Sequence, residues 1–167
     1  MNALDLLIIP DSAVASALFV SHVTQNTRFQ VQAAANERLW DDRDGAFFDN
    51  PSTFLHPQDG NALAVLYGLV QPPDRAGRIS EHLSKNWNAF GARTPEWNFD
   101  IGTFPGSLEV MAHAQAGKCA RALQLMRVQW GYMLRQPNST QSSFWEGYHS
   151  DGSFAYQGER ALRLRGA

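Results

Sequence analysis

The chain has 167 residues, of which 44% are hydrophobic, 11% aromatic and 18% charged. This length can bury a core of its own, so folding requires neither a disulfide framework nor a structural metal. The formal net charge of −2 gives no basic field. The composition therefore excludes nucleic acid and anionic membrane surfaces as expected partners. No glycine-rich phosphate loop and no paired metal-ligand motif occur, so we expect no cofactor and no metal site.

The apolar stretch over residues 1–20 is expected to contribute core structure. It contains Asp5, Pro10 and Asp11 and lacks a basic n-region. It is therefore typical of neither a signal peptide nor a membrane span, and the compartment stays undetermined. Cys119 is the single cysteine, and we expect it to pack in the interior as a small apolar residue.

Helical periodicity dominates the first half of the chain. We predict helices over 13–23 and 29–40, the first of them capped by Asp11-Ser12. Residues 45–51 are expected to form a short extended segment and a turn. Two further helices follow in the sequence, predicted over 59–70 and from the cap at Asp74 to about Phe90.

The second half continues this pattern. Residues 92–104 are expected to form a structured loop, and helices are predicted over 105–116 and 118–134. Past Pro137, residues 138–158 are rich in serine, glycine and aromatic side chains. Long loops of this kind in a compact domain are usually functional or disordered, and the large aromatic side chains over 144–154 argue against disorder. The sequence thus predicts an all-α chain of helical hairpins, with a short β or loop segment near 140–158.

The sharpest chemical cluster lies in that last segment, at the run Ser-Phe-Trp-Glu-Gly-Tyr-His over residues 143–149. Aromatic faces such as Trp145 and Tyr148 can stack on a sugar ring, and their low polarity tunes the pKa of a neighbouring carboxylate. Gly147 would let the backbone approach a ligand closely. Glu146 is therefore the candidate catalytic carboxylate. A surface glutamate with no catalytic role is the alternative left open by these residues.

A second cluster, His56-Pro57-Gln58-Asp59-Gly60-Asn61, precedes the apolar helix over 59–70. Asp59 suits a helix N-terminus for structural reasons, because its carboxylate can accept hydrogen bonds from free backbone N–H groups. His56 has no metal-ligand partner at a helical spacing, so a structural role is favoured. Both residues are also kept as candidate substrate-binding residues.

Two more candidates lie further along the chain. Trp97, between Glu96 and Asn98 in a loop, is a candidate sugar platform, whereas Trp87 follows the helical pattern and is expected in the core. Glu109 falls in the middle of an apolar helix. It is expected either to pair with His113, one turn on, or to face a polar cleft, and is included among the candidate substrate-binding residues.

Several of these motifs, taken in order, resemble fungal-type α-L-rhamnosidases of glycoside hydrolase family 78. The resemblance covers residues 3–158 and rests on Leu39-Trp40-Asp41, Phe48-Asp49, the run from Pro57 to Val65, the run from Gln129 to Met133, Phe144-Trp145-Glu146-Gly147-Tyr148, and Asp151-Gly152-Ser153-Phe154. It implies that residues 1–158 form the second half of an (α/α)6 barrel, a catalytic domain of six helical hairpins.

The resemblance also implies a reaction. Terminal α-L-rhamnosides would be hydrolysed with inversion, Glu146 would act as the general base, and Trp145, Trp97 and Tyr148 would line the pocket. Inverting enzymes place a general acid roughly 6.5–9.5 Å from the base, on the other face of the sugar. The family's general acid lies upstream of the matched motifs and has no counterpart in this chain. The expected partner is a carbohydrate.

The chain departs from the family pattern after Gly158. Residues 159–167 form a basic tail that is predicted to be divergent or truncated. Six hairpins need about 240 residues, so the chain is expected to be an incomplete barrel. The alternatives are a non-catalytic helical module that binds carbohydrate or a protein, and another hairpin-barrel enzyme such as a glucosidase or trehalase relative.

Overall fold

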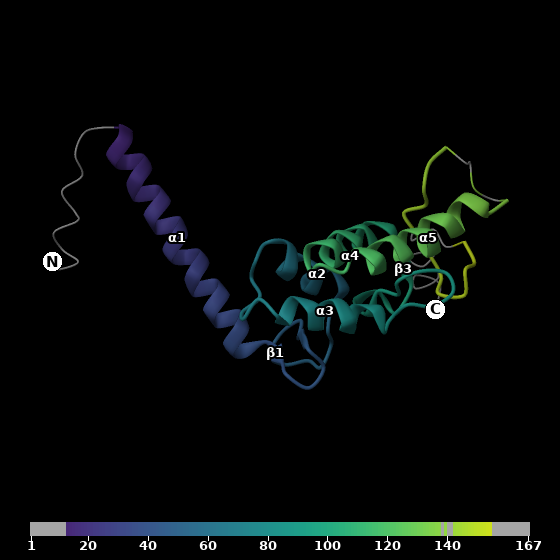
Figure 1. Cartoon of the computed structure of the whole chain (residues 1–167), viewed down its shortest axis with the longest axis horizontal. Coiled ribbons are helices and arrows are strands. Elements are labelled where there is room, and N and C mark those ends of the chain that lie inside the picture. The colour runs from purple at the N-terminus through teal and green to yellow at the C-terminus, as the bar shows by residue number, and fades with distance from the viewer. Residues whose placement is uncertain (1–12, 138, 140–141, 155–167) are drawn as a thin grey trace, which may run out of the picture.

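A computed structural model describes residues 13–137, 139 and 142–154, with side chains from residue 26 onward. The described chain is mostly α-helical, as predicted, with a few short strands (Figure 1). Its helices are α1 (Ala13–Arg38), α2 (Gln58–Leu66), α3 (Arg75–Ser84), α4 (Thr103–Gln115) and α5 (Cys119–Arg135). The predicted Asp11-Ser12 cap and the tail over 159–167 lie outside the described residues. No helix in the described part of the chain is long and apolar enough to cross a bilayer.

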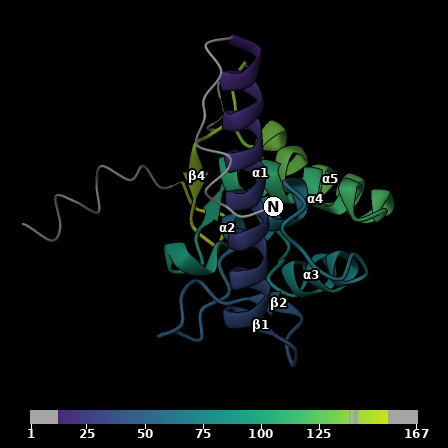
Figure 2. The same ribbon diagram turned by 90° about the vertical axis from the view of Figure 1, so that its left-hand side faces the viewer.

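Helix α1 is one continuous helix, so the prediction of two helices over 13–23 and 29–40 was wrong. The polar residues between them include neither proline nor glycine, and nothing there interrupts the helical hydrogen bonds. α1 projects away from the other helices and meets them near its C-terminal end (Figure 1), and Figure 2 shows it upright in front of them. Side-chain amides of Gln32 and Asn36 donate to the carbonyl groups of Gly68 and Leu69, both at 2.7 Å.

The strands form two separate two-stranded pairs. β1 (Trp40–Asp41) pairs antiparallel with β2 (Ala46–Phe47), which places the predicted extended segment in a hairpin. Gly45 closes its turn with a φ of +71°, a conformation that favours glycine. β3 (Ile101–Gly102) pairs antiparallel with β4 (Gly147–Tyr148). A short β or loop segment was predicted near 140–158, and the structure forms the short strand β4 there.

Helix α2 ends at Leu66, four residues before its predicted end at Val70. The reason is Gly68, whose φ is +65°. The backbone N–H of Leu69 donates to the carbonyl of Ala64 at 2.8 Å, and that of Gly68 donates to Val65 at 3.2 Å. This pair of bonds is the Schellman motif, which satisfies the last free carbonyl groups of a helix and reverses the chain.

Helix α3 starts directly after Asp74, as predicted, but ends at Ser84 and not near Phe90. Three successive residues after it donate to carbonyl groups three positions back, which tightens the last turn. The side chain of Asn88 then accepts the backbone N–H groups of Phe90 and Gly91 at 2.9 and 3.1 Å. This asparagine turn competes with further helix formation.

Helices α4 and α5 form a hairpin around Gly117, whose φ is +73°, and both match their predicted bounds within two residues. α4 also packs along α2, and this contact is the centre of the main core. Buried apolar residues there are Phe47, Ala62, Ala64, Val65, Val70, Ile79, Leu83, Leu108 and Ala112. Cys119 is exposed at the first position of α5, so the prediction of a packed thiol was wrong.

Candidate functional site

A short ribbon fixes the backbone on both sides of Glu146. In the β3–β4 pair, Gly102 lies opposite Gly147. The backbone N–H of Thr103 donates to the Glu146 carbonyl at 3.0 Å, and the Thr103 hydroxyl donates to the carbonyl of Trp145. Because Thr103 is the first residue of α4, these bonds hold Glu146 at the N-terminal end of this helix. The Glu146 side chain is exposed and can meet a ligand or water.

Trp97 lies directly against this ribbon. It ends the short 3-10 helix η1 (Pro95–Trp97) in the loop that leads into β3. A Cβ atom at Gly102 would come within 3.0 Å of the indole atom Cζ3, and one at Gly147 would lie 3.4 Å from the same atom and 3.0 Å from the carbonyl oxygen of Ile101. Gly147 therefore permits close approach of a strand and an indole ring. The close approach of a ligand at Gly147, expected from the sequence, stays a prediction.

An aromatic cluster packs around β4. Its members are Phe90, Tyr132, Trp145, Tyr148 and Phe154. Tyr148 is buried, and its hydroxyl donates to the carbonyl of Phe90 at 2.6 Å. Burial raises the pKa of the Tyr148 hydroxyl well above its ordinary value. The Trp145 ring meets Tyr148 and Phe154 edge-on, with centroids 5.6 and 5.1 Å apart. Trp145 is only partly buried, and it precedes the exposed Glu146 in the chain.

Glu96 connects this loop to the start of α2. Its carboxylate accepts the backbone N–H groups of Gln58 at 2.9 Å and of Asp59 at 3.1 Å. Burial raises the pKa of Glu96, although these two hydrogen bonds act in the opposite direction. Asp59 is exposed, and its carboxylate accepts the N–H of Gly60 at 2.5 Å. The structural role predicted for Asp59 at a helix N-terminus is thereby confirmed.

The starts of α2 and α4 consequently lie at one end of the molecule. Glu96 bonds the first, and its neighbour Trp97 contacts Gly102, the residue before α4. The sequence did not single out Glu96. The sequence did contain a sign that α2 needs an outside acceptor, because Pro57 occupies its N-cap position and has no side-chain acceptor. A partner from elsewhere in the chain was therefore needed.

Glu109 lies in the interior, with 1% of its surface exposed, and holds a buried polar network. One carboxylate oxygen accepts the indole N–H of Trp87 at 2.5 Å and lies 3.0 Å from Nε2 of His113. The other accepts the side-chain amide of Gln58 at 2.6 Å. The predicted pairing of Glu109 with His113 is confirmed. The half-buried Trp87 contributes a hydrogen bond as well as apolar contact.

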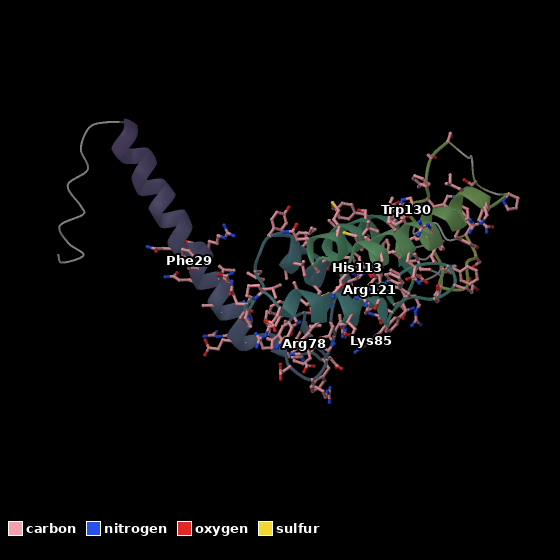
Figure 3. All side chains as sticks on the ribbon, in the orientation of Figure 1. Phe29, Arg78, Lys85, His113, Arg121 and Trp130 are labelled. Carbon is pink, nitrogen blue, oxygen red and sulfur yellow. The ribbon has the colours of Figure 1, made fainter. Side chains whose placement is uncertain are left out.

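This network includes two further hydroxyl groups, both from buried residues. Ser80 lies 2.7 Å from Nδ1 of His113 and accepts a bond from Arg121 at 2.7 Å. Thr94 donates to the side-chain carbonyl of Gln58 at 2.6 Å. Figure 3 labels His113 and Arg121 near the middle of the helical region, among α3, α4 and α5. Side chains from the four helices α2, α3, α4 and α5 thus share one set of hydrogen bonds.

His56 belongs to a different part of the molecule, beside the β1–β2 hairpin. Its Nε2 lies 3.1 Å from Oδ2 of Asp41, which confirms that the ring has a structural partner. Its ring stacks on Phe48 at 4.7 Å and meets His82 edge-on. Burial alone would raise the pKa of Asp41, but hydrogen bonds from backbone N–H groups of the turn and from His56 outweigh it and lower this pKa. Asp44 completes a group of three potential ligands with Asp41 and His56.

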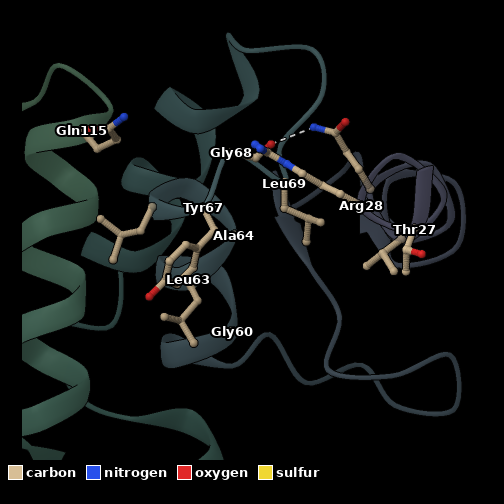
Figure 4. Close-up of a pocket in the computed structure, with 12 residues that line it drawn as sticks. Thr27, Arg28, Gly60, Leu63, Ala64, Tyr67, Gly68, Leu69 and Gln115 are labelled. Atoms are coloured by element: carbon tan, nitrogen blue, oxygen red, sulfur yellow. Dashed lines mark hydrogen bonds between the residues drawn. The ribbon is translucent and has the colours of Figure 1, made fainter. Parts of the chain in front are cut away.

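An open cleft of about 920 Å³ lies between α1 and α2 (Figure 4). Its walls are mainly apolar, and none of the predicted site residues lines it. Lining residues include Arg28, Val31 and Gln32 from α1 and Leu63, Tyr67 and Leu69 from α2 and the turn after it. This cleft is a gap between helices and is separate from the ribbon that carries Glu146.

Comparison with known proteins finds no family model and no curated protein that matches this chain. We therefore infer function from the residues themselves. Four of the predicted site residues, Trp97, Trp145, Glu146 and Tyr148, meet at the β3–β4 ribbon. Asp59 is joined to them through Glu96, whereas Glu109 lies in the core and His56 lies beside the β1–β2 hairpin.

Proposed function

We propose that this chain belongs to an inverting glycoside hydrolase that acts on terminal α-L-rhamnosides, with Glu146 as the general base. The observation that carries the proposal is the β3–β4 ribbon, which fixes the backbone of the exposed Glu146 between Trp145 and the glycine that lies against Trp97. Sugar hydrolysis uses carboxyl groups as base and acid, and aromatic rings near them can stack on the sugar. The motif resemblance described above supplies the substrate class.

The proposed architecture is part of an (α/α)6 barrel. In such a barrel the inner helices run in one direction and present their N-terminal ends to the site. α2 and α4 pack along each other, and both begin beside the loop that carries Glu96 and Trp97. α3 and α5 return the chain in the opposite direction. These contacts support α2 and α4 as inner helices and α3 and α5 as outer ones.

The proposed reaction assigns a separate step to each group. The Glu146 carboxylate takes a proton from a water molecule, and the water oxygen attacks the anomeric carbon from the face opposite the leaving group. The glycosidic C–O bond breaks, and a general acid outside the matched motifs protonates the leaving oxygen. Trp97 and Trp145 would contact the apolar face of the sugar and exclude bulk water.

Hydrolysis of p-nitrophenyl α-L-rhamnoside tests this proposal, because a nitrophenolate leaves with little help from an acid. We expect slow turnover by the chain, and NMR should detect β-L-rhamnose as the first product. Glu146→Gln should reduce the rate by about 10²- to 10⁴-fold. Glu81→Gln is the matched control, since Glu81 is an exposed glutamate on α3. Equal rates for wild type and Glu146→Gln would refute the role of Glu146 as base.

A second candidate function is a non-catalytic module that binds carbohydrate. The aromatic cluster and Trp97 favour it, because they form a surface for sugar stacking that needs no general acid. Rhamnose binding by calorimetry without any turnover of the nitrophenyl substrate would support this function. Loss of that binding in Trp97→Ala, with Glu146→Gln unaffected, would complete the distinction.

A further inference from the structure

The β1–β2 hairpin and the loop after it bring three metal-ligating side chains together. Asp41 ends β1, Asp44 lies in the turn, and His56 approaches from the segment before α2. Their ligand atoms all lie within 4.8 Å of one another. None of these residues lies at the β3–β4 ribbon, which is found at another end of the structure (Figure 1).

The distances fit shared coordination of one ion. Zinc–nitrogen and zinc–carboxylate bonds are about 2.0–2.2 Å, so two ligands on one ion lie roughly 2.9–3.5 Å apart. Nε2 of His56 and Oδ2 of Asp41 are 3.1 Å apart. The carboxylate of Asp44 is 38% exposed, so a side-chain rotation can bring it to the ion and leave an entry path from solvent.

Neighbouring groups already orient the two more buried ligands. The side chains of Asp41 and His56 are each 10% exposed. The second oxygen of Asp41 accepts the backbone N–H of Arg43 at 2.9 Å, which leaves Oδ2 directed at the histidine. Stacking on Phe48 and the edge contact with His82 hold the imidazole plane. Orientation of ligands by such partners is characteristic of metal sites.

The charges around the group also favour a cation. Arg78 is bonded to Asp42 at 2.6 Å, so it neutralises that carboxylate and not the two in the group. Arg43 lies 3.6 Å from Asp44, but its side chain is 80% exposed and contributes little. Asp41 and Asp44 together therefore offer two negative charges to a divalent ion. His82 is the other titratable group that packs here, and its Nδ1 lies 3.1 Å from the carbonyl oxygen of Asp44.

We propose that Asp41, Asp44 and His56 bind one divalent transition-metal ion of the zinc class, with water in the remaining positions. An imidazole nitrogen selects for zinc over magnesium and calcium, which take oxygen ligands. Three protein ligands leave at least one position open. Such an ion would link the β1–β2 hairpin to the segment that precedes α2, in addition to the contact between Asp41 and His56.

Zinc titration of the metal-free chain by calorimetry tests this site. The titration uses a Cys119→Ser background, because the exposed thiol of Cys119 is itself a zinc ligand. We expect one Zn²⁺ per chain, with affinity lowered at least tenfold by Asp44→Asn and abolished by His56→Gln. Co²⁺ in place of Zn²⁺ should give visible absorption bands that Asp44→Asn shifts or removes.

Asp42→Asn is the matched control, because it removes the same charge from the same turn at a side chain that is 81% exposed and bonded to Arg78. It should keep the wild-type affinity. Asp44→Asn keeps the shape of a partly exposed side chain, so it tests the site even if His56→Gln is misfolded. Absence of zinc binding by the Cys119→Ser chain, or equal affinities for Asp44→Asn and Asp42→Asn in that background, would overturn the proposal.

Discussion

Two glutamates, both candidate site residues from the sequence, occupy opposite environments in the structure. Glu109 is 1% exposed and contacts Trp87, His113 and Gln58 through both carboxylate oxygens. Glu146 is exposed, and the described bonds to it involve its backbone carbonyl. A buried carboxylate must be fully partnered, because desolvation without hydrogen bonds costs several kcal/mol. An exposed carboxylate on a fixed backbone remains available for chemistry. Glu109 therefore maintains the fold, whereas Glu146 is accessible to solvent and to a ligand.

The largest expected effect comes from the buried member of this pair. Glu109→Ala removes the acceptor for the Trp87 indole and the Gln58 amide and leaves these donors buried without partners. We expect the free energy of unfolding to fall by about 3–5 kcal/mol. Urea denaturation monitored by tryptophan fluorescence measures this change.

Glu109→Gln provides the matched comparison for that variant. Its amide oxygen can still accept one of the hydrogen bonds, so a smaller loss of about 1–3 kcal/mol is expected. If Glu109→Ala cost less than about 1 kcal/mol, the network would not be a stabilising element and the contrast with Glu146 would fail.

A medium effect is expected at Glu96, which caps α2 from a distant loop. Glu96→Ala leaves the N–H groups of Gln58 and Asp59 without their acceptor. Loss of a helix N-cap typically costs about 0.5–2 kcal/mol, and we expect a value in this range. Thermal unfolding followed by circular dichroism should show the decrease. Glu81→Ala on the exposed face of α3 is the control and should change stability by less than about 0.5 kcal/mol.

The pKa of Glu96 predicts a further, smaller effect that depends on pH. Burial raises this pKa above its ordinary value of 4.5, so the folded state binds the proton more tightly than the unfolded state. The resulting stability is fully present below pH 4.5 and is lost as pH rises through the folded-state pKa. Glu96→Gln does not titrate, so the wild type should lose stability relative to this variant across that window. A constant difference in urea midpoint from pH 4 to pH 7 would contradict the direction of this shift.

The smallest expected effect on stability is at Glu146 itself. Glu146→Gln changes an exposed side chain and keeps the backbone bond with Thr103, so the free energy of unfolding should change by less than about 0.5 kcal/mol. The same variant should lose most of any glycosidase activity. A large loss of stability in a melting experiment would place Glu146 with Glu109, as a residue of the fold.

The sequence by itself determined the elements whose signals are local. The helices over 105–116 and 118–134 were predicted within two residues, because apolar periodicity, Pro105 in a first turn and Gly117 after it act over short distances. The pairing of Glu109 with His113, four residues apart on one helix, was predicted for the same reason. Local composition also predicted a short β or loop segment near 140–158, where β4 lies.

Only the tertiary structure decided the features that join distant segments. Glu96 caps α2 across 38 residues, Thr103 fixes Glu146 from the start of α4, and His56 meets Asp41 across 15 residues. The ends of α2 and α3 were also missed, because a glycine turn and an asparagine turn overrode the apolar periodicity that continued past them. Cys119 was expected in the core, but its place in the first turn of α5 exposes it. Periodicity predicts which residues share a helical face, whereas the chain's three-dimensional path decides which of those faces and loops come into contact.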